Sequence, residues 1–572
     1  PLYQKNILSV IRQVVTADNS KPDLTLCLNG IPIATAELKN PATGQNYEDA
    51  ITQYKEDRDP TDKLFSFKRG ALVHFAIDPN EVFMTTKLQK DKTQFLPFNQ
   101  GKNDGKGNPD NPNGYNTAYL WESIWQRDSI IEIISNFVDL QIVQQHPLPD
   151  KENIIFPRYH QLDAVLKLVE STRQNGAGKN YLVEHSTGSG KSNTISWLAY
   201  KLLSLFDSQD KTIFDGILVL SDRVGIVNQL GKTIQQFEQT SGTVVAVRDS
   251  KDLADNLANK RRIVISTQQK FPYVLDYISK VKGKKFAIII DEAHSSQSPE
   301  SRKKIQEVLT TNLKEAEKQE GQIQSQQQDI VDAIEKEMEI RGNQDTLSYY
   351  AFTATPKSKT LKLFGTPISD KVNVPFHVYS MRQAIEEGFI LDVLKNYTTY
   401  ERNFRILKTA SEDKVVEGKK ASRALLNYVD THSLNISKKS AIIVDHFVEH
   451  TQPKIGGQAK AMVVGSSRDQ ALKYKQEIDE YISKQNIKGV NTLVAFSGTL
   501  KDDTGKTFTE QSMNGTRSDW ELREKFDTPE YNILIVAEKY QTGFDQPLLH
   551  TMYVDKKLHG IKAVQTLSRL NR

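Results

Sequence analysis

Three charged residues near the N-terminus have side chains suited to metal-dependent hydrolysis. They are Asp23, Glu37 and Lys39, in the segment PDLTLCLNGIPIATAELKN. Two carboxylates can share a divalent metal ion, and an adjacent lysine can orient an attacking water. Two runs rich in Leu, Ile and Thr flank Asn29-Gly30, a dipeptide typical of a tight β-hairpin turn. The segment therefore predicts a hairpin whose charges are either surface charges or part of a metal-dependent nuclease site.

A second group of residues has the composition of a phosphate-binding loop. The apolar run YLVEH is followed by STGSGKS and by the helical pattern NTISWLAYKLL. Successive backbone N–H groups in such a loop cradle phosphates, while Lys191 would reach the β- and γ-phosphates and Ser192 would ligate Mg²⁺. The full pattern has Gly where His185 stands, so a glycine-rich turn that merely starts a helix is the alternative. The other residues of the cradle are Thr187, Gly188, Ser189 and Gly190.

Two adjacent carboxylates end another apolar run further along the chain. The run is FAIIIDEAH, which contains Asp291, Glu292 and His294. Asp291 would hold Mg²⁺ through water and Glu292 would polarise the attacking water, which are roles that phosphoryl transfer requires. The alternatives are charges that cap the next helix and a structural histidine. Because the pair follows a phosphate loop, the sequence favours an ATPase.

The elements that must position these residues follow from the alternation of apolar and polar runs. Between residues 146 and 375, short apolar runs alternate with segments of helical length, which predicts a parallel sheet covered by helices. These runs are YLVEHS, GILVLS, RIVIST, FAIIID and YYAFTAT, and the same style returns later in AMVVGSS, NTLVAFSG, NILIVAE and TMYVD. We therefore expect an α/β fold with three domains, over residues 1–145, 146–375 and 376–572.

Length and composition exclude several classes of protein. The 572 residues are too many for one hydrophobic core, and no apolar run approaches the roughly 18 residues of a membrane span. With 26% charged residues, a net charge of +4 and a single cysteine, Cys27, we expect a soluble cytoplasmic protein without an internal disulfide. Residues 99–116, rich in Gly, Asn and Asp, predict a surface loop. The Gln-rich residues 312–345 predict a solvated helical insertion or a partly disordered one.

These motifs, in this order, resemble those of superfamily 2 helicases and translocases. The resemblance extends to RYHQ before the phosphate loop, to VLSDR, ISTQ and FTATP after it, and to VVGSSR, EKYQTGFDQP and QTLSRLNR in the second half. It implies two RecA-like domains that use ATP and Mg²⁺. In that family, Gln161 matches the residue that reads the adenine base. Gln565, Arg569 and Arg572 match the last motif, whose arginines reach the γ-phosphate.

The same resemblance implies where such a motor touches nucleic acid. Translocases grip mainly phosphates, so binding should depend on salt and little on base sequence. The matching positions are Arg223, Thr267, Ser467 and Thr542. Each could instead be a capping or turn residue.

An Asp…Glu-x-Lys domain ahead of this motor resembles the R (restriction, HsdR) subunit of type I restriction-modification enzymes. QAIEEGFILDVLKNYTTY and LIVAEKYQTGFDQPLLHTMYVDKKL also look like that family. The resemblance implies a PD-(D/E)xK endonuclease-like first domain and a motor that pumps double-stranded DNA without separating its strands. It implies cutting remote from the recognition site, separate modification (M) and specificity (S) partner subunits, a prokaryotic cytoplasmic location and no membrane partner.

This family resemblance assigns roles to the charged residues of the hairpin. Asp23 and Glu37, with the backbone carbonyl of Leu38, would hold Mg²⁺. Lys39 would orient the attacking water and help to deprotonate it.

Gln53, on the following helix, matches a position at which related nucleases contact DNA or the metal-bound water. The usual tyrosine four residues later is Asp57 here, so a plain solvated helix residue is the alternative. Because few residues precede Asp23, we also expect the chain to start inside this domain or to join across gaps.

The hairpin and the nuclease interpretations together make a demand on strand register. A strict two-residue turn at Asn29-Gly30 would leave Asp23 and Glu37 on opposite faces of the hairpin, because side chains alternate along a strand. A shared metal ion needs both carboxylates on one face. We therefore predict an extra residue in the turn or a β-bulge near Pro32, which cannot donate a ladder hydrogen bond.

Two other functions fit parts of the sequence. One is a superfamily 2 helicase or remodelling ATPase whose N-terminal domain is a non-catalytic binding module with solvent-exposed charges. The other is a DNA-scaffolding protein with a degenerate ATP site. DNA-stimulated release of phosphate would exclude the scaffold, and loss of DNA cutting on substitution of Glu37 would exclude the binding module.

Overall fold

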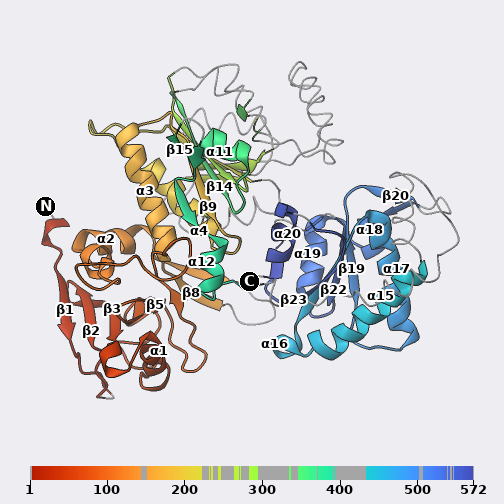
Figure 1. The fold of residues 1–572 in the computed structure, drawn as a ribbon, viewed down its shortest axis with the longest axis horizontal. Coiled ribbons are helices and arrows are strands. Elements are labelled where there is room, and N and C mark those ends of the chain that lie inside the picture. The colour runs from red at the N-terminus through yellow and green to blue at the C-terminus, as the bar shows by residue number, and fades with distance from the viewer. Residues whose placement is uncertain are drawn as a thin grey trace. The chain divides into compact units, whose positions relative to one another are not determined.

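The computed structural model divides the chain into two compact units (Figure 1). The first comprises Pro1–Arg302 and Gln328–Phe389, and the second comprises Lys303–Gln327 and Ile390–Arg572. The structure describes residues 3–17, 19–143, 151–221, 231, 234–235, 243–246, 263–268, 271, 283–293, 331, 334–335, 345–369, 372–390, 392, 433–501, 507–537, 539–540, 544, 546–558 and 560–570. Most of the Gln-rich stretch at 312–345 therefore lies outside the described residues.

The first unit begins with a six-stranded sheet in the order β1-β2-β3-β4-β5-β6. Its strands are β1 (Leu8–Arg12), β2 (Leu24–Leu28), β3 (Ile31–Leu38), β4 (Val73–Ile77), β5 (Val82–Thr85) and β6 (Leu96–Pro97). Only β3 and β4 run parallel, because helix α1 (Tyr47–Glu56) makes the crossover between them. Asn46 starts this helix with a capping box, in which its side chain accepts a hydrogen bond from the helix backbone and the carboxylate of Asp49 accepts one from the backbone N–H of Asn46.

The predicted turn joins β2 and β3. Asn29 and Gly30 both have left-handed backbone angles, with φ of 52° and 81°, as a two-residue hairpin turn requires. Asn29 also holds the preceding chain, since its Oδ1 accepts a hydrogen bond from the backbone N–H of Ile7 at 2.9 Å. The dipeptide therefore fixes the start of the ladder.

The predicted bulge is present next to Pro32. Cys27 faces Pro32 in the ladder, whereas the next residue back, Leu26, faces Ala34. Ile33 is thus the extra residue, and the register beyond it is shifted by one. The prediction of a bulge near Pro32 is confirmed.

The larger part of the first unit is a seven-stranded parallel sheet in the order β11-β12-β10-β13-β14-β9-β17. Its strands are β9 (Tyr181–His185), β10 (Gly216–Ser221), β11 (Val244–Ala246), β12 (Ile263–Thr267), β13 (Phe286–Asp291), β14 (Leu347–Thr353) and β17 (His377–Tyr379). The predicted strands are thus confirmed, and their almost uninterrupted burial fits a sheet covered on both faces. Helices α3 (Tyr159–Asn175) and α4 (Lys191–Leu203) share one core with the sheet, and α11 (Ser358–Phe364) belongs to a second core.

Smaller elements complete the first unit. They are helices α2 (Arg127–Asn136) and α12 (Met381–Glu386), the antiparallel pairs β7 (Asp139–Val143) with β8 (Lys151–Ile155) and β15 (Thr366–Ser369) with β16 (Val372–Val374), a π-helical turn at Leu120–Ile124, and 3-10 turns at Tyr3–Lys5 and Pro41–Thr43. Strand β17 lies beyond residue 375 yet pairs with β9, so the first parallel sheet extends past the boundary expected from the sequence.

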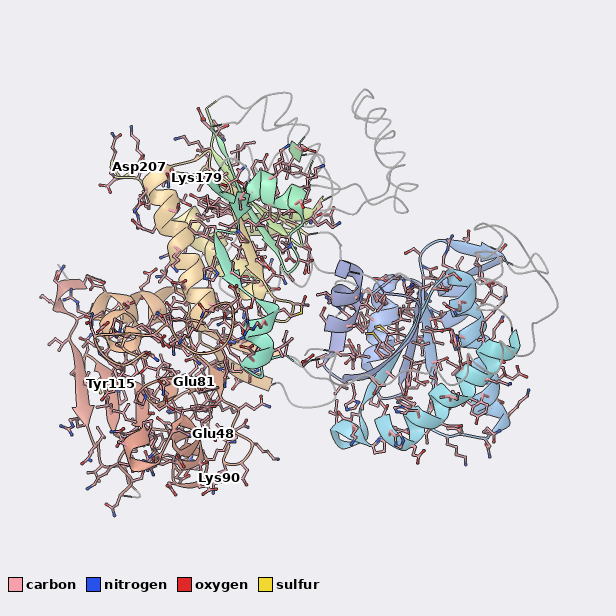
Figure 2. The ribbon with its side chains drawn as sticks, in the orientation of Figure 1. Glu48, Glu81, Lys90, Tyr115, Lys179 and Asp207 are labelled. Carbon is pink, nitrogen blue, oxygen red and sulfur yellow. The ribbon has the colours of Figure 1, made fainter. Side chains whose placement is uncertain are left out.

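One hydrophobic core joins the N-terminal sheet to the first parallel sheet. Phe75 of β4 lies 6.2 Å from Phe156, which directly precedes α3, and 5.7 Å from Phe98, measured between ring centroids. The two sheets therefore form a single packed body. Side chains of this unit are drawn in Figure 2, where Glu48 and Glu81 mark its N-terminal sheet domain and Lys179 marks the parallel-sheet domain.

The Asn- and Gly-rich loop at 99–116 contains no helix or named strand, as expected, but it is held by its own amides. Asn108 is almost fully buried and donates to the carbonyl of Asn80 at 2.8 Å and to Oδ1 of Asn99 at 2.9 Å. The loop also contacts the start of α12, because the Ser380 hydroxyl donates to the carbonyl of Asp104 at 2.6 Å.

The second unit contains a four-stranded parallel sheet in the order β19-β22-β18-β23. Its elements are α15 (Ser433–His446), a π-helical turn (Phe447–Thr451), α16 (Lys454–Gly457), β18 (Lys460–Gly465), α17 (Arg468–Lys484), β19 (Thr492–Ala495), β20 (Thr499–Lys501), β21 (Thr507–Thr509), α18 (Glu510–Asn514), α19 (Asp519–Asp527), β22 (Ile533–Ala537), β23 (Leu549–Asp555), α20 (Gly560–Leu567) and a 3-10 turn (Ser568–Leu570). Two separate cores line its faces, one with α15 and α17 and one with α19. The fold class is thus the predicted one: a mixed α/β domain followed by two parallel-sheet domains. Across the described residues, no helix combines the length and the apolar character needed to cross a bilayer.

Candidate functional site

The bulge brings Asp23 and Glu37 to facing positions at the ends of β2 and β3. Beyond it, Leu24 pairs with Ala36, so the next pair along the ladder is Asp23 with Glu37. Residues that face each other across an antiparallel pair project from the same side of the sheet. Oδ2 of Asp23 accepts a hydrogen bond from the backbone N–H of Leu38 at 2.8 Å, which holds its carboxylate beside the end of β3.

Glu37 is completely buried and is paired with an arginine that the sequence had not singled out. Nε and Nη2 of Arg58 each lie 2.7 Å from Oε1 of Glu37. Oε2 of Glu37 is also buried and has no hydrogen-bond partner among the described residues. Burial raises the pKa of Glu37 to about 7, although the positive charge of Arg58 acts in the opposite direction.

Lys39 and Gln53 meet beside this carboxylate. Lys39 lies two residues after Glu37, and its Nζ donates a hydrogen bond to Oε1 of Gln53 at 2.5 Å. Gln53 is on α1, the crossover helix. The structure therefore brings together four residues that the sequence suggested for this site, Asp23, Glu37, Lys39 and Gln53.

Buried hydrogen bonds connect β3 to helix α1 and to strand β4. The hydroxyl of Thr35 lies 2.9 Å from the Tyr54 hydroxyl and 2.8 Å from Nδ1 of His74. All three side chains are buried, and burial lowers the pKa of His74 to about 3, so its ring is neutral. Asp57, which stands at the position of the usual tyrosine, is instead the C-cap of α1.

The donor atoms at the hairpin suit a hard divalent cation. Carboxylate and carbonyl oxygens are the ligands that Mg²⁺ prefers, and Mg²⁺ usually keeps several waters. The partnerless Oε2 of Glu37 is an atom that such an ion could satisfy. Over the part of the chain that the structure describes, no three His, Cys, Asp or Glu side chains gather as a metal cluster. An ion here would therefore depend on Asp23, Glu37, a carbonyl and water.

The phosphate loop connects β9 to α4. Gly188 and Gly190 have left-handed φ angles of 82° and 81°, which residues with a side chain rarely adopt, and Thr187, which precedes them in the loop, is buried. The hydroxyls of Ser186 and Ser189 are buried without a hydrogen-bond partner among the described residues. Unpaired donors in a tight loop at a helix N-terminus are suited to phosphate oxygens.

Gln161 is engaged with this loop. Its Nε2 donates to the carbonyls of Ser189 at 3.2 Å and Gly190 at 3.1 Å, and its Oε1 accepts from the backbone N–H of Arg158. A Cβ atom at position 190 would lie 2.5 Å from Nε2 of Gln161. The amide thus braces the phosphate loop, and its assignment as adenine reader stays a prediction.

Lys191 faces the carboxylates at the end of β13. Its Nζ lies 3.6 Å from Oε1 of Glu292 and 3.4 Å from the carbonyl of His185. Glu292 has a left-handed φ of 56°, a strained conformation for a residue with a side chain. Asp291, the last residue of β13, is buried. Ser192 is half-buried in the first turn of α4, and His294 lies outside the described residues.

His185 fills the position where the P-loop pattern has glycine. It is fully buried, and its Nε2 lies 3.0 Å from Nδ1 of His377, whose Nε2 lies 3.1 Å from Oδ2 of Asp163. Burial holds the pKa of His185 well below its usual range. The next residue, Ser186, donates its backbone N–H to the carbonyl of Tyr379 at 2.9 Å. Strand β17 therefore supports the start of the loop.

The residues expected to touch nucleic acid or to complete the nucleotide site are only partly described. Thr267 ends β12 and is half-buried, and the neighbouring Gln268 donates to the carbonyl of Asp291 at 2.8 Å. The Ser467 hydroxyl caps α17 by accepting from the backbone N–H of Gln470, which is the capping alternative stated above. Outside the described residues lie Arg223, Thr542, Arg572 and the side chain of Gln565.

Within the second unit, Arg569 is buried, and its Nη1 donates to the carbonyl of Phe544 at 3.1 Å. This contact ties the last motif to the segment that follows EKYQTG.

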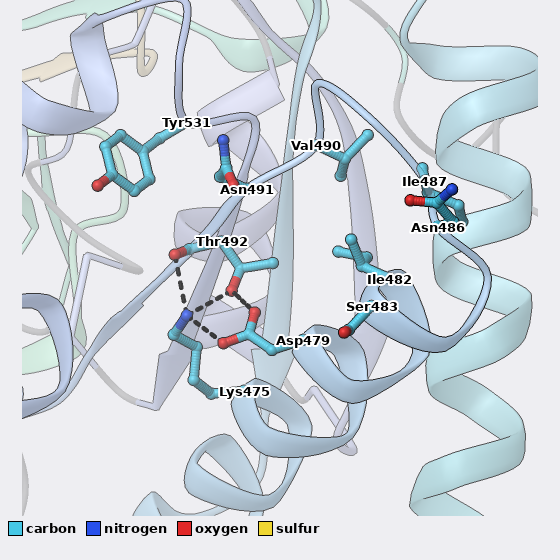
Figure 3. Close-up of a pocket in the computed structure, with 10 residues that line it drawn as sticks. All are labelled: Lys475, Asp479, Ile482, Ser483, Asn486, Ile487, Val490, Asn491, Thr492 and Tyr531. Atoms are coloured by element: carbon cyan, nitrogen blue, oxygen red, sulfur yellow. Dashed lines mark hydrogen bonds and ion pairs between the residues drawn. The ribbon is translucent and has the colours of Figure 1, made fainter.

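A hollow of about 350 Å³ in the second unit is lined by none of the residues that the motifs single out (Figure 3). Nζ of Lys475 donates to Oδ2 of Asp479 at 2.5 Å and to Oγ1 and the carbonyl oxygen of Thr492 at 2.8 and 3.1 Å. These polar groups form hydrogen bonds with one another at the start of β19, so they give no indication of a ligand site.

Models of known protein families match three parts of the chain. The model of the Type I restriction enzyme R protein N terminus matches residues 3–93. The model of the SWI2/SNF2 ATPase matches residues 160–424, and that of Type I restriction enzyme subunit R domain 3 matches residues 501–572.

Relatives are similar over nearly the whole chain. The "Putative type I restriction enzyme MjaVIIIP endonuclease subunit" of Methanocaldococcus jannaschii is 25% identical over 626 residues, covering 100% of this chain and 55% of its own length. The Type I restriction enzyme HindI endonuclease subunit of Haemophilus influenzae is 23% identical over 589 residues, covering 96% of this chain and 50% of its own length. The chain thus spans about half the length of these relatives.

A solved structure described as "The fragment structure of a putative HsdR subunit of a type I restriction enzyme from Vibrio vulnificus YJ016" is 14% identical and covers 99% of this chain and 85% of that one. Its TM-score is 0.43, which is too low to establish a shared fold. The family models and the relatives agree with each other: this chain resembles the R subunit of type I restriction enzymes, with an N-terminal R-protein domain followed by a superfamily 2 ATPase.

Proposed function

We propose that the chain is an ATP-dependent double-stranded DNA translocase and Mg²⁺-dependent endonuclease, the restriction subunit of a type I restriction-modification complex. It acts with separate modification and specificity subunits in the cytoplasm of a prokaryote and cuts DNA away from the recognition site. The observation that carries the proposal is the shared face of Asp23 and Glu37, which the bulge at Ile33 creates. A hairpin that only needed to fold would have no reason to place a buried carboxylate there.

In the proposed cutting reaction, Asp23, Glu37 and the carbonyl of Leu38 hold the metal ion. Bound Mg²⁺ supplies a polarised phosphodiester oxygen and a water of lowered pKa. Lys39, whose Nζ donates a hydrogen bond to Gln53 at 2.5 Å, would orient the attacking water, and its positive charge would favour release of that water's proton to solvent. The buried walls around Glu37 exclude bulk water and strengthen these electrostatic contacts.

In the proposed ATPase site, the residues from Thr187 to Gly190 cradle the phosphates, and Ser192 and Asp291 hold Mg²⁺. Lys191 is paired with Glu292 at 3.6 Å. When ATP binds, we expect the ammonium group of Lys191 to turn to the β- and γ-phosphates, and Glu292 would orient the attacking water. Gln161, Gln565, Arg569 and Arg572 stay predicted nucleotide contacts, and Arg223, Thr267, Ser467 and Thr542 stay predicted DNA contacts.

The decisive experiment separates cutting from ATP turnover. Variants Glu37→Ala, Asp23→Asn and Lys191→Ala are each combined with the modification and specificity subunits and a supercoiled plasmid that bears the recognition site. Glu37→Ala and Asp23→Asn should abolish cutting while ATP turnover persists, and Lys191→Ala should abolish both. Glu56→Ala, an exposed carboxylate on α1, is the matched control and should keep both activities.

Persistent cutting by Glu37→Ala and Asp23→Asn would refute the nuclease assignment and favour a remodelling ATPase with a non-catalytic N-terminal domain. If DNA did not stimulate phosphate release by the unaltered protein, the motor assignment would fail instead.

A further inference from the structure

Arg58 is a charged residue with only 5% of its surface exposed, which is uncommon for arginine. It directly follows Asp57, the C-cap of α1. Its guanidinium group holds Glu37 through Nε and Nη2, and Nη2 also donates to the carbonyl of Lys21 at 3.2 Å. One side chain thus connects the end of α1, the middle of the site and the segment that enters β2.

The contact with Glu37 is one-sided. An arginine and a carboxylate commonly pair through two parallel hydrogen bonds, one to each oxygen. Here both nitrogens of Arg58 lie 2.7 Å from Oε1, whereas Oε2 is buried and has no hydrogen-bond partner among the described residues. The arrangement fixes the carboxylate by one oxygen and leaves the other available to a ligand.

Two residues at or just beyond the end of helix α1 hold two side chains of the proposed site. Gln53 holds Lys39, and Arg58 holds Glu37. Lys39 directly follows β3, and its backbone N–H still donates to the carbonyl of Ile77 in β4 at 2.8 Å, so the alternation of the strand places its side chain on the same side as that of Glu37. Helix α1, through Gln53, and the residue that follows its C-cap, Arg58, therefore set the orientation of the proposed water-orienting lysine and of the proposed metal ligand.

We propose that Arg58 is a positioning residue of the nuclease site, which anchors Oε1 of Glu37 so that Oε2 points to the metal ion. This inference rests on the proposed nuclease function, because Arg58 acts only through Glu37, the proposed metal ligand. Residues that orient metal ligands through hydrogen bonds change metal affinity about 10- to 100-fold when they are replaced.

The test measures Mn²⁺ binding to the whole chain without nucleotide, from the electron paramagnetic resonance signal of free Mn²⁺. Asp23→Asn defines the binding that belongs to this site. Arg58→Met should weaken that binding about 10- to 100-fold, and Arg58→Lys should weaken it less, because an ammonium group keeps the charge but lacks the planar fork. Arg69→Met, an exposed arginine of the same domain, should bind like the unaltered protein.

A second readout is DNA cutting by the assembled complex over a range of Mg²⁺ concentrations. Arg58→Met should raise the concentration needed for half-maximal cutting more than it lowers the rate at saturation, because the ligand is misaligned and the chemistry is retained. ATP turnover, which depends on the parallel-sheet domains, reports whether each variant is folded and should be unchanged.

The outcomes separate this inference from the function on which it rests. If Asp23→Asn removes no Mn²⁺ binding, the metal site itself is refuted. If Asp23→Asn removes it but Arg58→Met binds Mn²⁺ as well as the unaltered protein or better, Arg58 only neutralises a buried charge and the inference is overturned. If Arg58→Met also loses ATP turnover, Arg58→Lys decides: weaker Mn²⁺ binding with intact turnover supports the inference, and unchanged binding overturns it.

Discussion

Burial changes the proton affinity of Glu37 more than its charged neighbours do. Loss of hydration raises its pKa, Arg58 and, more weakly, Lys39 lower it, and Asp23 raises it, so that the resulting pKa is about 7. A carboxylate with this pKa is half protonated near neutral pH. Metal ions bind the ionised form, so the affinity of Glu37 for a metal must increase as the pH rises toward and above 7.

DNA cutting should therefore have an acid limb centred near pH 7, the pKa of Glu37. Well below that pH the rate should fall about tenfold per pH unit, since the ionised fraction falls by that factor. Raising the Mg²⁺ concentration should move the midpoint to lower pH, because the metal competes with the proton for the same carboxylate. Plasmid cutting is measured at several pH values, and ATP turnover in the same solutions supplies the control. An acid limb that Mg²⁺ does not move would contradict this assignment.

At the scale of elements, the phosphate loop depends on a close approach between α3 and the start of α4. Gly190, the N-cap of α4, combines a left-handed φ of 81° with an amide from Gln161 lying where a side chain would begin. Gly176, the C-cap that follows α3, has a similar φ of 72°, but no atom of a residue beyond its chain neighbours lies within 4 Å of the place that a Cβ atom would take there. Gly176 is thus a glycine of positive φ that lies outside the phosphate loop and lacks the close contact of Gly190.

Gly190→Ala should weaken ATP binding at least about tenfold, because the new Cβ displaces the Gln161 brace by which the loop keeps its shape. Gly176→Ala should leave ATP affinity unchanged and lower the free energy of unfolding by about 1–3 kcal/mol, since its backbone angles are almost exclusive to glycine. Binding of a fluorescent ATP analogue and urea unfolding measure the two effects. Equal loss of ATP affinity in both variants would contradict a specific role for the contact between Gly190 and Gln161.

At the scale of the whole molecule, the hydrophobic cores define fewer units than the motifs do. The N-terminal sheet and the first parallel sheet share one continuous core, whereas the second unit has cores of its own. Residues that share a core lose their packing together, so the first unit should unfold as one body. Although the sequence suggests three domains, we expect two cooperative transitions.

Calorimetry on matched core variants tests this expectation. Val183→Ala removes two methyl groups from the core of the first unit and Val463→Ala does so in the second, at fully buried positions. Each should lower the stability of its own unit by roughly 2 kcal/mol and leave the transition of the other unit in place. A single transition that both variants shift equally would contradict the division into two units.

Local patterns were enough to predict much of this protein. The order of the motifs gave the fold class, the apolar runs gave the strands, and the Asn29-Gly30 turn gave the hairpin. The bulge followed from counting, because an odd number of residues separates Asp23 from Glu37 and a two-residue turn leaves one residue over. These features depend on backbone preferences and side-chain alternation, which neighbouring residues determine.

Contacts between distant segments were decided only by the tertiary structure. No local pattern indicates that Arg58 turns back to Glu37, that Gln161 braces a loop nearly thirty positions away, or that β17 joins the first parallel sheet. The hydrophobic core that the first two expected domains share is also formed by contacts between distant segments, which no local pattern indicates. Burial of a charge or an amide is stable only where folding supplies its partner. The sequence by itself therefore determined which residues carry the chemistry, and the packing of remote elements determined how they are held.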